Sequence, residues 1–230
     1  MNIVIFGPPG AGKGTQAKNL EKKLNNFQIS TGDMLRDEIK KESEIGKKII
    51  SNMNEGKFVD DEIVNNLIKN VVFDPQKKNK LIFDGYPRTL EQAENLELLL
   101  KESDQKVDFV FFLNVNKDTI VQRIEKRKII EKRSDDDLNT ILKRYDTYME
   151  TTKPVLDYYS SRSDFHEIDG GLKIEEITTK INTILKRYDT YMLTTKPVLE
   201  YYSTKPNFNE IDGGLKITEI TSKINNILGV

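Results

Sequence analysis

A glycine-rich stretch near the start of the chain combines a pliable backbone with one cation. It has the sequence GPPGAGKGT, and Lys13 is its charged residue. Glycines let the backbone N–H groups point inward around an anion, and the amino end of a following helix adds a favourable dipole. The stretch therefore predicts a phosphate-binding loop, in which the lysine lies against the outer phosphates of a nucleotide. The candidate contacts are Gly10, Ala11, Gly12, Lys13, Gly14 and Thr15.

The hydroxyl of this loop comes one place later than in the general phosphate-loop pattern. Gly14 stands where that pattern has Ser or Thr, and Thr15 follows it. The form GxPGxGKGT resembles the loop of nucleoside monophosphate kinases. Taken alone, the loop indicates nucleotide binding and no particular second substrate.

A second group of polar residues follows an apolar run in KLIFDGYPRTLEQA. Asp84 ends the run, and Arg88 and Gln92 come after a Gly-Tyr-Pro turn. Polar groups at the carboxyl end of a strand lie where open α/β sheets bind ligands. A carboxylate there suits Mg²⁺ and its waters, and an arginine suits a phosphate. The alternative to a ligand site is that Asp84 and Arg88 form a purely structural pair. The phosphate loop upstream favours the ligand site.

Two more segments carry polar residues beside predicted helix boundaries. In ISTGDMLRDEI, Ser30 or Thr31 can cap a helix, and Arg36 follows where a guanidinium can bind a phosphate with two N–H groups. In MNEGKFVDDEIV, Gly56 ends one helix and Asp60 or Asp61 starts the next. A capped amphipathic helix with a solvated arginine is the alternative for the first segment.

Four arginines lie in or beside a lysine-rich segment that follows a strand-like run, Val107–Val115. Arg123 and Arg127 are four residues apart and so share one face of a helix. Arg133 precedes an acidic helix start, and Arg144 lies within that helix. In-line phosphoryl transfer spreads negative charge over several oxygens, so fixed cations and positioning provide most of its catalysis. The arginines suit this chemistry, although an arginine-rich helix can also be merely solvated.

The elements that must position these groups alternate between strands and helices. Met1–Phe6 is a β-branched run predicted to be a buried strand, and Ala17, Leu20 and Leu24 mark one face of the next helix. Strand, glycine loop and helix in this order are typical of α/β proteins. The predicted fold class is α/β, with a P-loop NTPase-type parallel β-sheet flanked by helices.

Composition narrows the class of partner. Lys and Arg number 36 against 37 Asp and Glu, so net charge gives no case for a nucleic-acid or membrane surface. The chain has no cysteine, which excludes disulfides, thiolate metal ligands and a cysteine nucleophile and suits a reducing compartment. The apolar start is too short for a signal peptide or a membrane span. We expect a globular cytoplasmic protein with no nucleic acid and no membrane as partner.

Together, these segments resemble the adenylate kinase family from Met1 to about Leu185. The resemblance implies reversible transfer of a phosphoryl group from Mg-ATP to AMP, giving two ADP. The implied parts are a core of residues 1–29, 60–126 and 134–185, a small AMP-binding insert of residues 30–59, and a short lid of residues 127–133 with a mobile loop at 128–132. Because only KIIEK separates Arg127 from Arg133, the long lid that can carry zinc in bacterial members is absent, and no zinc is expected.

The resemblance also implies roles for single residues. The implied catalytic residues are Lys13, Arg36, Asp84, Arg88, Arg127, Arg133 and Arg144. On the ATP side, Arg123, Arg127 and the backbone at Leu172 join the phosphate loop. Thr15 and Asp84 hold Mg²⁺ through waters, with no direct protein ligand. The AMP side consists of Thr31, Arg36, Lys57, Phe58, Val59, Gly85, Tyr86, Pro87, Arg88, Gln92, Arg133 and Arg144.

Thr31 indicates which base the acceptor nucleotide carries. Adenylate-specific members have Thr at this place, whereas UMP/CMP kinases usually have Ala, so the resemblance favours adenine. A UMP/CMP kinase is the nearest alternative. A nucleotide-binding scaffold with impaired catalysis is the other, and in that case the repeated end of the chain would serve assembly.

The end of the chain repeats an earlier segment. Residues 139–181, here copy one, align with residues 182–224, here copy two, at a shift of 43, and all but nine positions agree. Slipped duplication at the shared tetrapeptide NTIL is the simplest origin, so residues 182–230 are an addition to a kinase unit of residues 1–185. No Gly or Pro interrupts the junction, which predicts one helix over residues 174–193.

One copy must complete the predicted active site. Arg187 of copy two aligns with Arg144, but Glu176 stands where Arg133 would be. Copy one also has the shorter connection, so we expect copy one docked and copy two appended. The alternative is an exchange in which copy two fills the place in a neighbouring chain. The apolar faces left over need a partner, so we expect a monomer or a homodimer formed through copy two.

Overall fold

The structure is a computed structural model that describes residues 1–55, 57–131 and 138–229. Its chain divides into two compact units, Met1–Lys180 and Ile181–Val230. The first contains copy one except for its last residue, and the second contains copy two. Among the described residues, no helix has both the length and the apolar character needed to cross a membrane.

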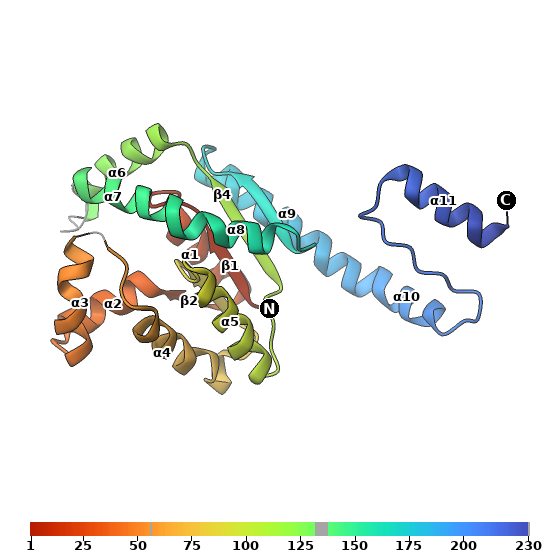
Figure 1. Ribbon diagram of the computed structural model, residues 1–230, viewed down its shortest axis with the longest axis horizontal. Helices are drawn as coiled ribbons and strands as arrows, with labels where there is room; N and C mark the ends of the chain where they lie inside the picture. Colours follow the sequence, from red (N-terminus) through yellow and green to blue (C-terminus); the bar gives the residue numbers. More distant parts are fainter. Residues whose placement is uncertain (56, 132–137, 230) are drawn as a thin grey trace. The chain divides into compact units, whose positions relative to one another are not determined.

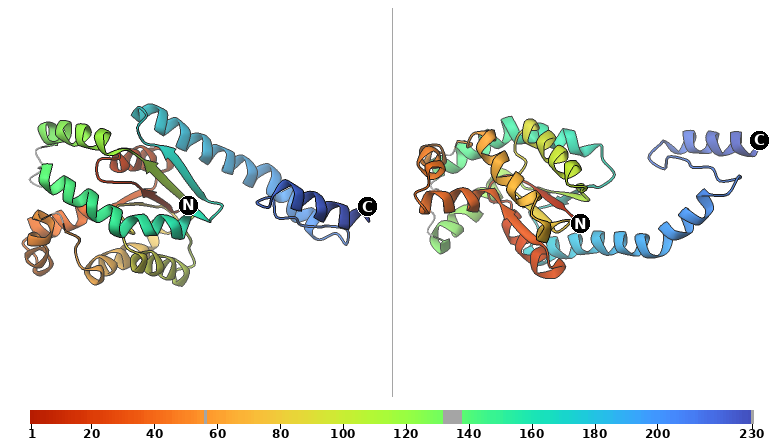
Figure 2. Two further views of the ribbon diagram at one scale, coloured as in Figure 1. Left: turned by 45° about the horizontal axis from the view of Figure 1, so that its top comes forward. Right: turned by 90° about the horizontal axis from the view of Figure 1, so that it is seen from below.

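A five-stranded parallel sheet forms the centre of the Met1–Lys180 unit (Figures 1 and 2). Its order is β2-β3-β1-β4-β5. The strands are β1 Ile3–Phe6, β2 Phe27–Ser30, β3 Leu81–Asp84, β4 Phe109–Asn114 and β5 Phe165–Asp169. The central strand β1 is buried along its whole length, because parallel sheets carry helices on their faces. The predicted α/β fold class is confirmed.

Helices connect and flank these strands (Figure 1). They are α1 Lys13–Leu24, α2 Thr31–Lys40, α3 Glu44–Asn54, α4 Asp61–Val72, α5 Leu90–Glu102, α6 Lys117–Glu131, α7 Leu138–Thr147 and α8 Lys153–Ser160. A short 3-10 helix, Pro75–Lys77, precedes β3, and a π-helical turn, η2 Tyr148–Thr152, joins α7 to α8. The described part of the predicted lid loop at 128–132 is helical, since α6 continues to Glu131. The segment KIIEK has no Gly or Pro to stop a helix.

Side-chain caps stabilise the starts of the helices that follow strands β2 and β3. Ser30, and not Thr31, caps α2, and its hydroxyl accepts a hydrogen bond from the Asp33 N–H at 3.2 Å. The Thr89 hydroxyl caps α5 in the same way, accepting from the N–H of Gln92 at 3.2 Å. Such caps stabilise a helix by about 1 kcal/mol. They fix where the residues after β2 and β3 leave the sheet.

Copy one is part of the core of this unit. Val155 and Tyr159 of α8 are fully buried and belong to one apolar cluster with Val4 and Leu96. The ring of Tyr159 lies 5.5 Å from that of Phe6, centroid to centroid. Strand β5, also from copy one, pairs in parallel with β4. The sheet edge and one side of the core are therefore made from copy one.

The Ile181–Val230 unit has helices and no strand among its described residues. Helix α9, Ile174–Thr190, runs through the junction of the two copies without a break. It is followed by a π-helical turn, η3 Tyr191–Thr195, and by α10 Lys196–Ser203 and α11 Ile217–Leu228. Segment 208–212, which corresponds to β5, forms no strand.

Candidate active site

A cavity of about 740 Å³ opens beyond the carboxyl ends of β1, β2 and β3. Its walls come from the glycine-rich loop, the starts of α1 and α2, the segment 57–59, the turn after β3, and helices α6 and α7. The volume falls in the usual range of roughly 300–1,000 Å³ for ligand sites. Open α/β sheets bind ligands at this edge.

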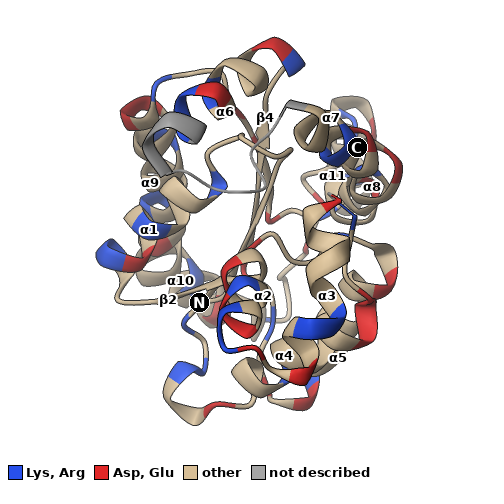
Figure 3. Cartoon of the chain, turned by 90° about the vertical axis from the view of Figure 1, so that its left-hand side faces the viewer, with Lys and Arg blue, Asp and Glu red and all other residues tan. Residues whose placement is uncertain are grey.

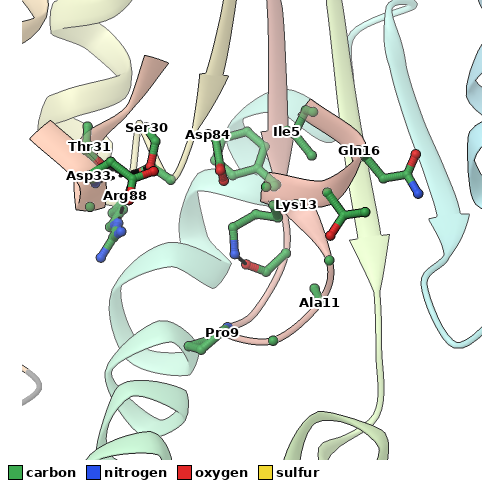
Figure 4. Close-up of a pocket in the computed structure, with 18 of the residues that line it drawn as sticks. Ile5, Pro9, Ala11, Lys13, Gln16, Ser30, Thr31, Asp33, Asp84 and Arg88 are labelled. Atoms are coloured by element: carbon green, nitrogen blue, oxygen red, sulfur yellow. Dashed lines mark hydrogen bonds between the residues drawn. The ribbon is translucent and has the colours of Figure 1, made fainter. Parts of the chain in front are cut away.

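The glycine-rich loop has the geometry of a phosphate-binding loop. Gly10 and Gly12 have φ angles of 79° and 93°, in the left-handed region that favours glycine. A Cβ at Gly10 would also come within 2.9 Å of Ile124, so the loop packs closely on α6. The Lys13 ammonium donates to the carbonyls of Gly7 and Pro8 at 2.7 and 3.0 Å. Figure 4 shows this side chain curled inside the loop, close to Asp84.

The cations of the cavity perturb one another. Burial lowers the pKa of Lys13 to about 8; the carboxylate of Asp84 opposes this shift, and the charges of Arg88 and Arg127 add to it. Burial also lowers the pKa of Arg88 to about 10, with further lowering by Arg144 and Arg36. Both groups would regain their usual affinity for protons if a polyanion bound between them. The cavity is therefore suited to phosphates.

The positive charge comes from several elements. Arg127 of α6 and Arg144 of α7 line the cavity, as does Arg36 of α2, which pairs with Asp33 at 2.5 Å. Figure 3 shows Lys and Arg positions on α1, α2, α6 and α7, the helices around this site. Arg133 lies outside the described residues.

Asp84 and Thr15 bring two oxygen donors to the cavity. Asp84 ends β3, and its Oδ2 accepts a hydrogen bond from Gln28 Nε2 at 3.0 Å. Thr15 is exposed in the first turn of α1. Within the described parts of the chain, no three His, Cys, Asp or Glu side chains gather as metal ligands. The residues present fit an Mg²⁺ ion that keeps its waters and is held mainly by nucleotide phosphates.

On the opposite side of the cavity, Arg88 lies beside Ser30 and Thr31 (Figure 4). Its Nε donates to the Gly85 carbonyl at 2.7 Å, and its guanidinium stacks over the ring of Phe58 at 5.1 Å. These two contacts leave the guanidinium fixed in place. Lys57, Val59 and Pro87 complete this wall, and Lys57 forms an ion pair with Glu55 at 2.7 Å.

Thr31 and Gln92 are both buried and both held by hydrogen bonds. The Thr31 hydroxyl donates to the Gly85 carbonyl at 2.8 Å. The Gln92 Nε2 donates to Asp61 Oδ1 at 2.5 Å, and its Oε1 accepts from the backbone N–H of Arg88 at 2.8 Å. The orientation of the Gln92 amide is therefore set by Asp61. The sequence pattern marks Asp61 only as a possible helix start.

Arg123 connects two predicted parts of the ATP side. Its guanidinium donates to the carbonyls of Ala11, in the loop, and Leu172, near the end of copy one, at 3.4 and 3.3 Å. Leu172 itself does not line the cavity. Tyr86 does not line it either, because its ring is buried in the core. The Tyr86 hydroxyl donates to Asn65 and accepts from Asn95, at 2.8 and 3.0 Å.

All other predicted site residues that are described line this one cavity. They come from segments as far apart as the glycine-rich loop and α7. Gln28 was not predicted as a site residue, since nothing in its local sequence marks it. Its contact with Asp84 joins two neighbouring strands that are distant in sequence.

Comparison with known proteins agrees with this arrangement. The sequence model of the family described as adenylate kinase matches residues 5–164. The chain is 47% identical over 207 residues to an adenylate kinase of Pelagibacter ubique, and 40% identical over 209 residues to one of Mycoplasma capricolum. Both matches cover 79% of this chain and 97% of the relative. An adenylate kinase of Archaeoglobus fulgidus is 36% identical over 208 residues, covering 79% of this chain and 96% of the relative.

About a fifth of the chain has no counterpart in these matches, which is also the share that copy two takes up. Over the rest, the matched relatives carry one and the same name. With the phosphate loop, the cation-lined cavity and the parallel sheet described above, these matches show that the chain belongs to the adenylate kinase family.

Proposed function

We propose that this member of the adenylate kinase family transfers the terminal phosphoryl group of Mg-ATP to AMP, reversibly, giving two ADP. One observation carries the proposal: a single cavity holds a phosphate loop on one wall and a fixed arginine on another. Lys13 and Arg88, which represent these walls, each have a pKa lowered by burial and by the other cations. Two phosphate-bearing ligands that meet between the walls would neutralise both.

On the donor side, the loop residues would bind the phosphates of ATP. The backbone N–H groups of residues 10–15 and the start of α1 favour negative charge, and Lys13 would contact the outer phosphates. Asp84 and Thr15 would hold Mg²⁺ through water, and the bound ion would screen charge on the transferred group. Arg123 would contact the adenine.

On the acceptor side, arginines would fix the phosphate of AMP for in-line attack. Arg88 and Arg36 line that wall, and Arg127 and Arg144 also line the cavity. Their charges would stabilise the negative charge that spreads over the transferring phosphoryl group. Positioning and charge account for this reaction, and no side chain is required as a general base.

Water must be kept from the phosphoryl group, or ATP would be hydrolysed. We propose that residues 30–59 and the lid close over the bound nucleotides. A bisubstrate analogue that joins two adenosines through phosphates should then bind far more tightly than ATP. Binding of one nucleotide only, with no response to the analogue, would contradict the proposal.

Adenine is the proposed base of the acceptor because Thr31 and Gln92 both line its wall. The decisive experiment measures ADP formation from ATP with AMP, UMP or CMP under equal conditions. We expect AMP to be preferred by at least about tenfold, the order that a few base-edge hydrogen bonds provide. Equal or greater use of UMP or CMP would favour a UMP/CMP kinase, and no transfer to any of them would favour a nucleotide-binding scaffold.

A further inference from the structure

The chain has two copies of one segment but one place for it in the sheet. In copy one, Phe165–Asp169 pairs with β4, and Val155 and Tyr159 are fully buried. Their counterparts in copy two are Val198 and Tyr202, which are 54% and 55% exposed. The same residue types therefore form a core in one copy and an exposed apolar face in the other.

Copy two already has the helical structure of copy one. The π-helical turns Tyr148–Thr152 and Tyr191–Thr195 occupy equivalent positions, and so do helices α8 and α10. Helices α9 and α11 also begin at equivalent residues, Ile174 and Ile217. These elements form in both settings, so docking of copy two would require its strand to form and the continuous helix α9 to open at the junction.

We propose that copy two can replace copy one in the Met1–Lys180 unit of the same chain. Residues 208–212 would then pair with β4, and Val198 and Tyr202 would take the places of Val155 and Tyr159. Copy one would become an insertion ahead of copy two. The entropy of closing a loop grows only with the logarithm of its length, so the added 43 residues weigh little against this arrangement.

Hydrophobic burial does not decide between the two arrangements. Each buries one copy and exposes the other, so the apolar areas nearly cancel. The free-energy difference between the two arrangements therefore depends on the nine positions at which the copies differ and on the length of chain that connects the docked copy.

One group of contacts at these positions favours copy one. Arg162 donates to Glu97 of α5 at 2.6 Å, to both carboxylate oxygens of Asp164 at 2.9 and 2.6 Å, and to the Val107 carbonyl at 3.1 Å. All three charged side chains are partly buried, and the guanidinium also stacks over Tyr159 at 5.3 Å. The planar fork of arginine is what makes this set of bonds.

Copy two cannot make the same contacts. It has Lys205 in place of Arg162 and Asn207 in place of Asp164. A lysine lacks the fork, and an asparagine lacks the charge. The arrangement with copy two docked is therefore the minor one, and converting these two positions should change its population.

Site-specific crosslinking can test the exchange, because the chain has no cysteine of its own. Asn114 Nδ2 donates to Glu167 Oε1 at 2.8 Å between β4 and β5, and both residues are exposed. The double variant Asn114→Cys, Glu167→Cys reports docking of copy one. Asn114→Cys, Glu210→Cys reports docking of copy two at the equivalent position. Both are treated with a short bismaleimide in dilute solution, and crosslinks within single chains are measured by mass spectrometry.

We expect the 114–167 crosslink to dominate and the 114–210 crosslink to form at about a tenth of its yield or less, as for a minor state. Adding Arg162→Lys and Asp164→Asn should raise the 114–210 yield at least about threefold, since copy one then loses its charge-assisted bonds. Adding Lys205→Arg and Asn207→Asp instead should raise it as well, while copy one stays intact. This second pair keeps the test valid if the first weakens folding.

Two controls separate docking from chance collision. Glu175→Thr also gives copy one the residue of copy two, but at an exposed position, and should leave both yields unchanged. Asn114→Cys, Glu219→Cys places the second cysteine elsewhere in copy two. Equal yields for positions 210 and 219, an absent 114–210 crosslink in every background, or a crosslink only between two chains would each overturn the proposal. None of these readouts depends on kinase activity.

Discussion

Copy one and copy two have nearly the same sequence and differ in what surrounds them. Their π-helical turns and helices α8 and α10 begin and end at equivalent residues, and helices α9 and α11 begin at equivalent residues. The edge-to-face pair Tyr158–Tyr159 even recurs as Tyr201–Tyr202, with ring centroids 5.0 and 5.2 Å apart. The strand Phe165–Asp169, in contrast, has no counterpart in copy two. Local sequence is thus sufficient for the helical parts, whereas the strand forms only where β4 offers backbone partners.

The largest expected effect concerns residues that serve either copy. Lys13 and Arg88 lie outside both, so Lys13→Ala or Arg88→Ala should lower turnover at least about a hundredfold whichever copy is docked. Circular dichroism should show the fold retained. Near-normal ADP production by either purified variant would contradict the proposed site.

The second-largest expected effect is a difference between equivalent arginines of the two copies in their contribution to turnover. Arg144 lines the cavity from copy one, so Arg144→Ala should lower turnover at least about thirtyfold, whereas Arg187→Ala should stay within about twofold of the parent. If copy two can replace copy one, the double variant will lose the activity that remains in Arg144→Ala. Greater damage from Arg187→Ala alone would reverse the assignment of the docked copy.

Stability gives a second comparison of the copies. Tyr159→Ala removes a fully buried ring and should lower the free energy of unfolding by about 3–5 kcal/mol, whereas Tyr202→Ala should change it by less than about 0.5 kcal/mol. Urea titration of the two variants measures both. If copy two takes over when Tyr159 is lost, Tyr159→Ala alone will lower the free energy of unfolding by less than this. The double variant will then lose more than the two single variants together.

A smaller effect should appear in the pH profile and should be the same whichever copy is docked. Since the pKa of Lys13 is lowered to about 8, kcat/KM for ATP should fall as pH rises through that value, as the ammonium is lost from the free enzyme. Lys13→Arg keeps its charge and should lack this decline. For stability the sign is opposite: burial of the charged Lys13 is unfavourable below pH 8, and this cost is relieved as pH rises toward its ordinary pKa of 10.5.

Local patterns in the sequence predicted the parts of the site that lie on one segment. The phosphate loop, Asp84 and Arg88 each follow a strand closely, so strand and motif together place them. Gln28 and Asp61 could not be found in this way. Each acts through a hydrogen bond to a predicted site residue on a distant segment, Asp84 and Gln92 respectively, and sequence spacing does not show such contacts.

At two places the structure differs from what a motif or a resemblance suggests, and each difference has a physical reason. Tyr86 follows the motif that carries Asp84, yet its ring turns into the core because Asn65 and Asn95 satisfy its hydroxyl there. The lid loop was placed by resemblance, and α6 continues through Lys128–Glu131 because nothing in that segment ends a helix. Core packing determines the position of Tyr86, and helix propagation determines the structure of 128–131. The local motif does not show either effect.

Helix α9 has a consequence for the rate at which the two arrangements could interconvert. It closes copy one and opens copy two as a single helix of 17 residues, with no glycine or proline where it could bend. For copy two to dock, the backbone hydrogen bonds across the junction must open, so exchange has to wait for local unfolding and cannot follow fast loop motion. We expect relaxation over milliseconds or longer, slow enough for the two arrangements to give separate signals in NMR spectra.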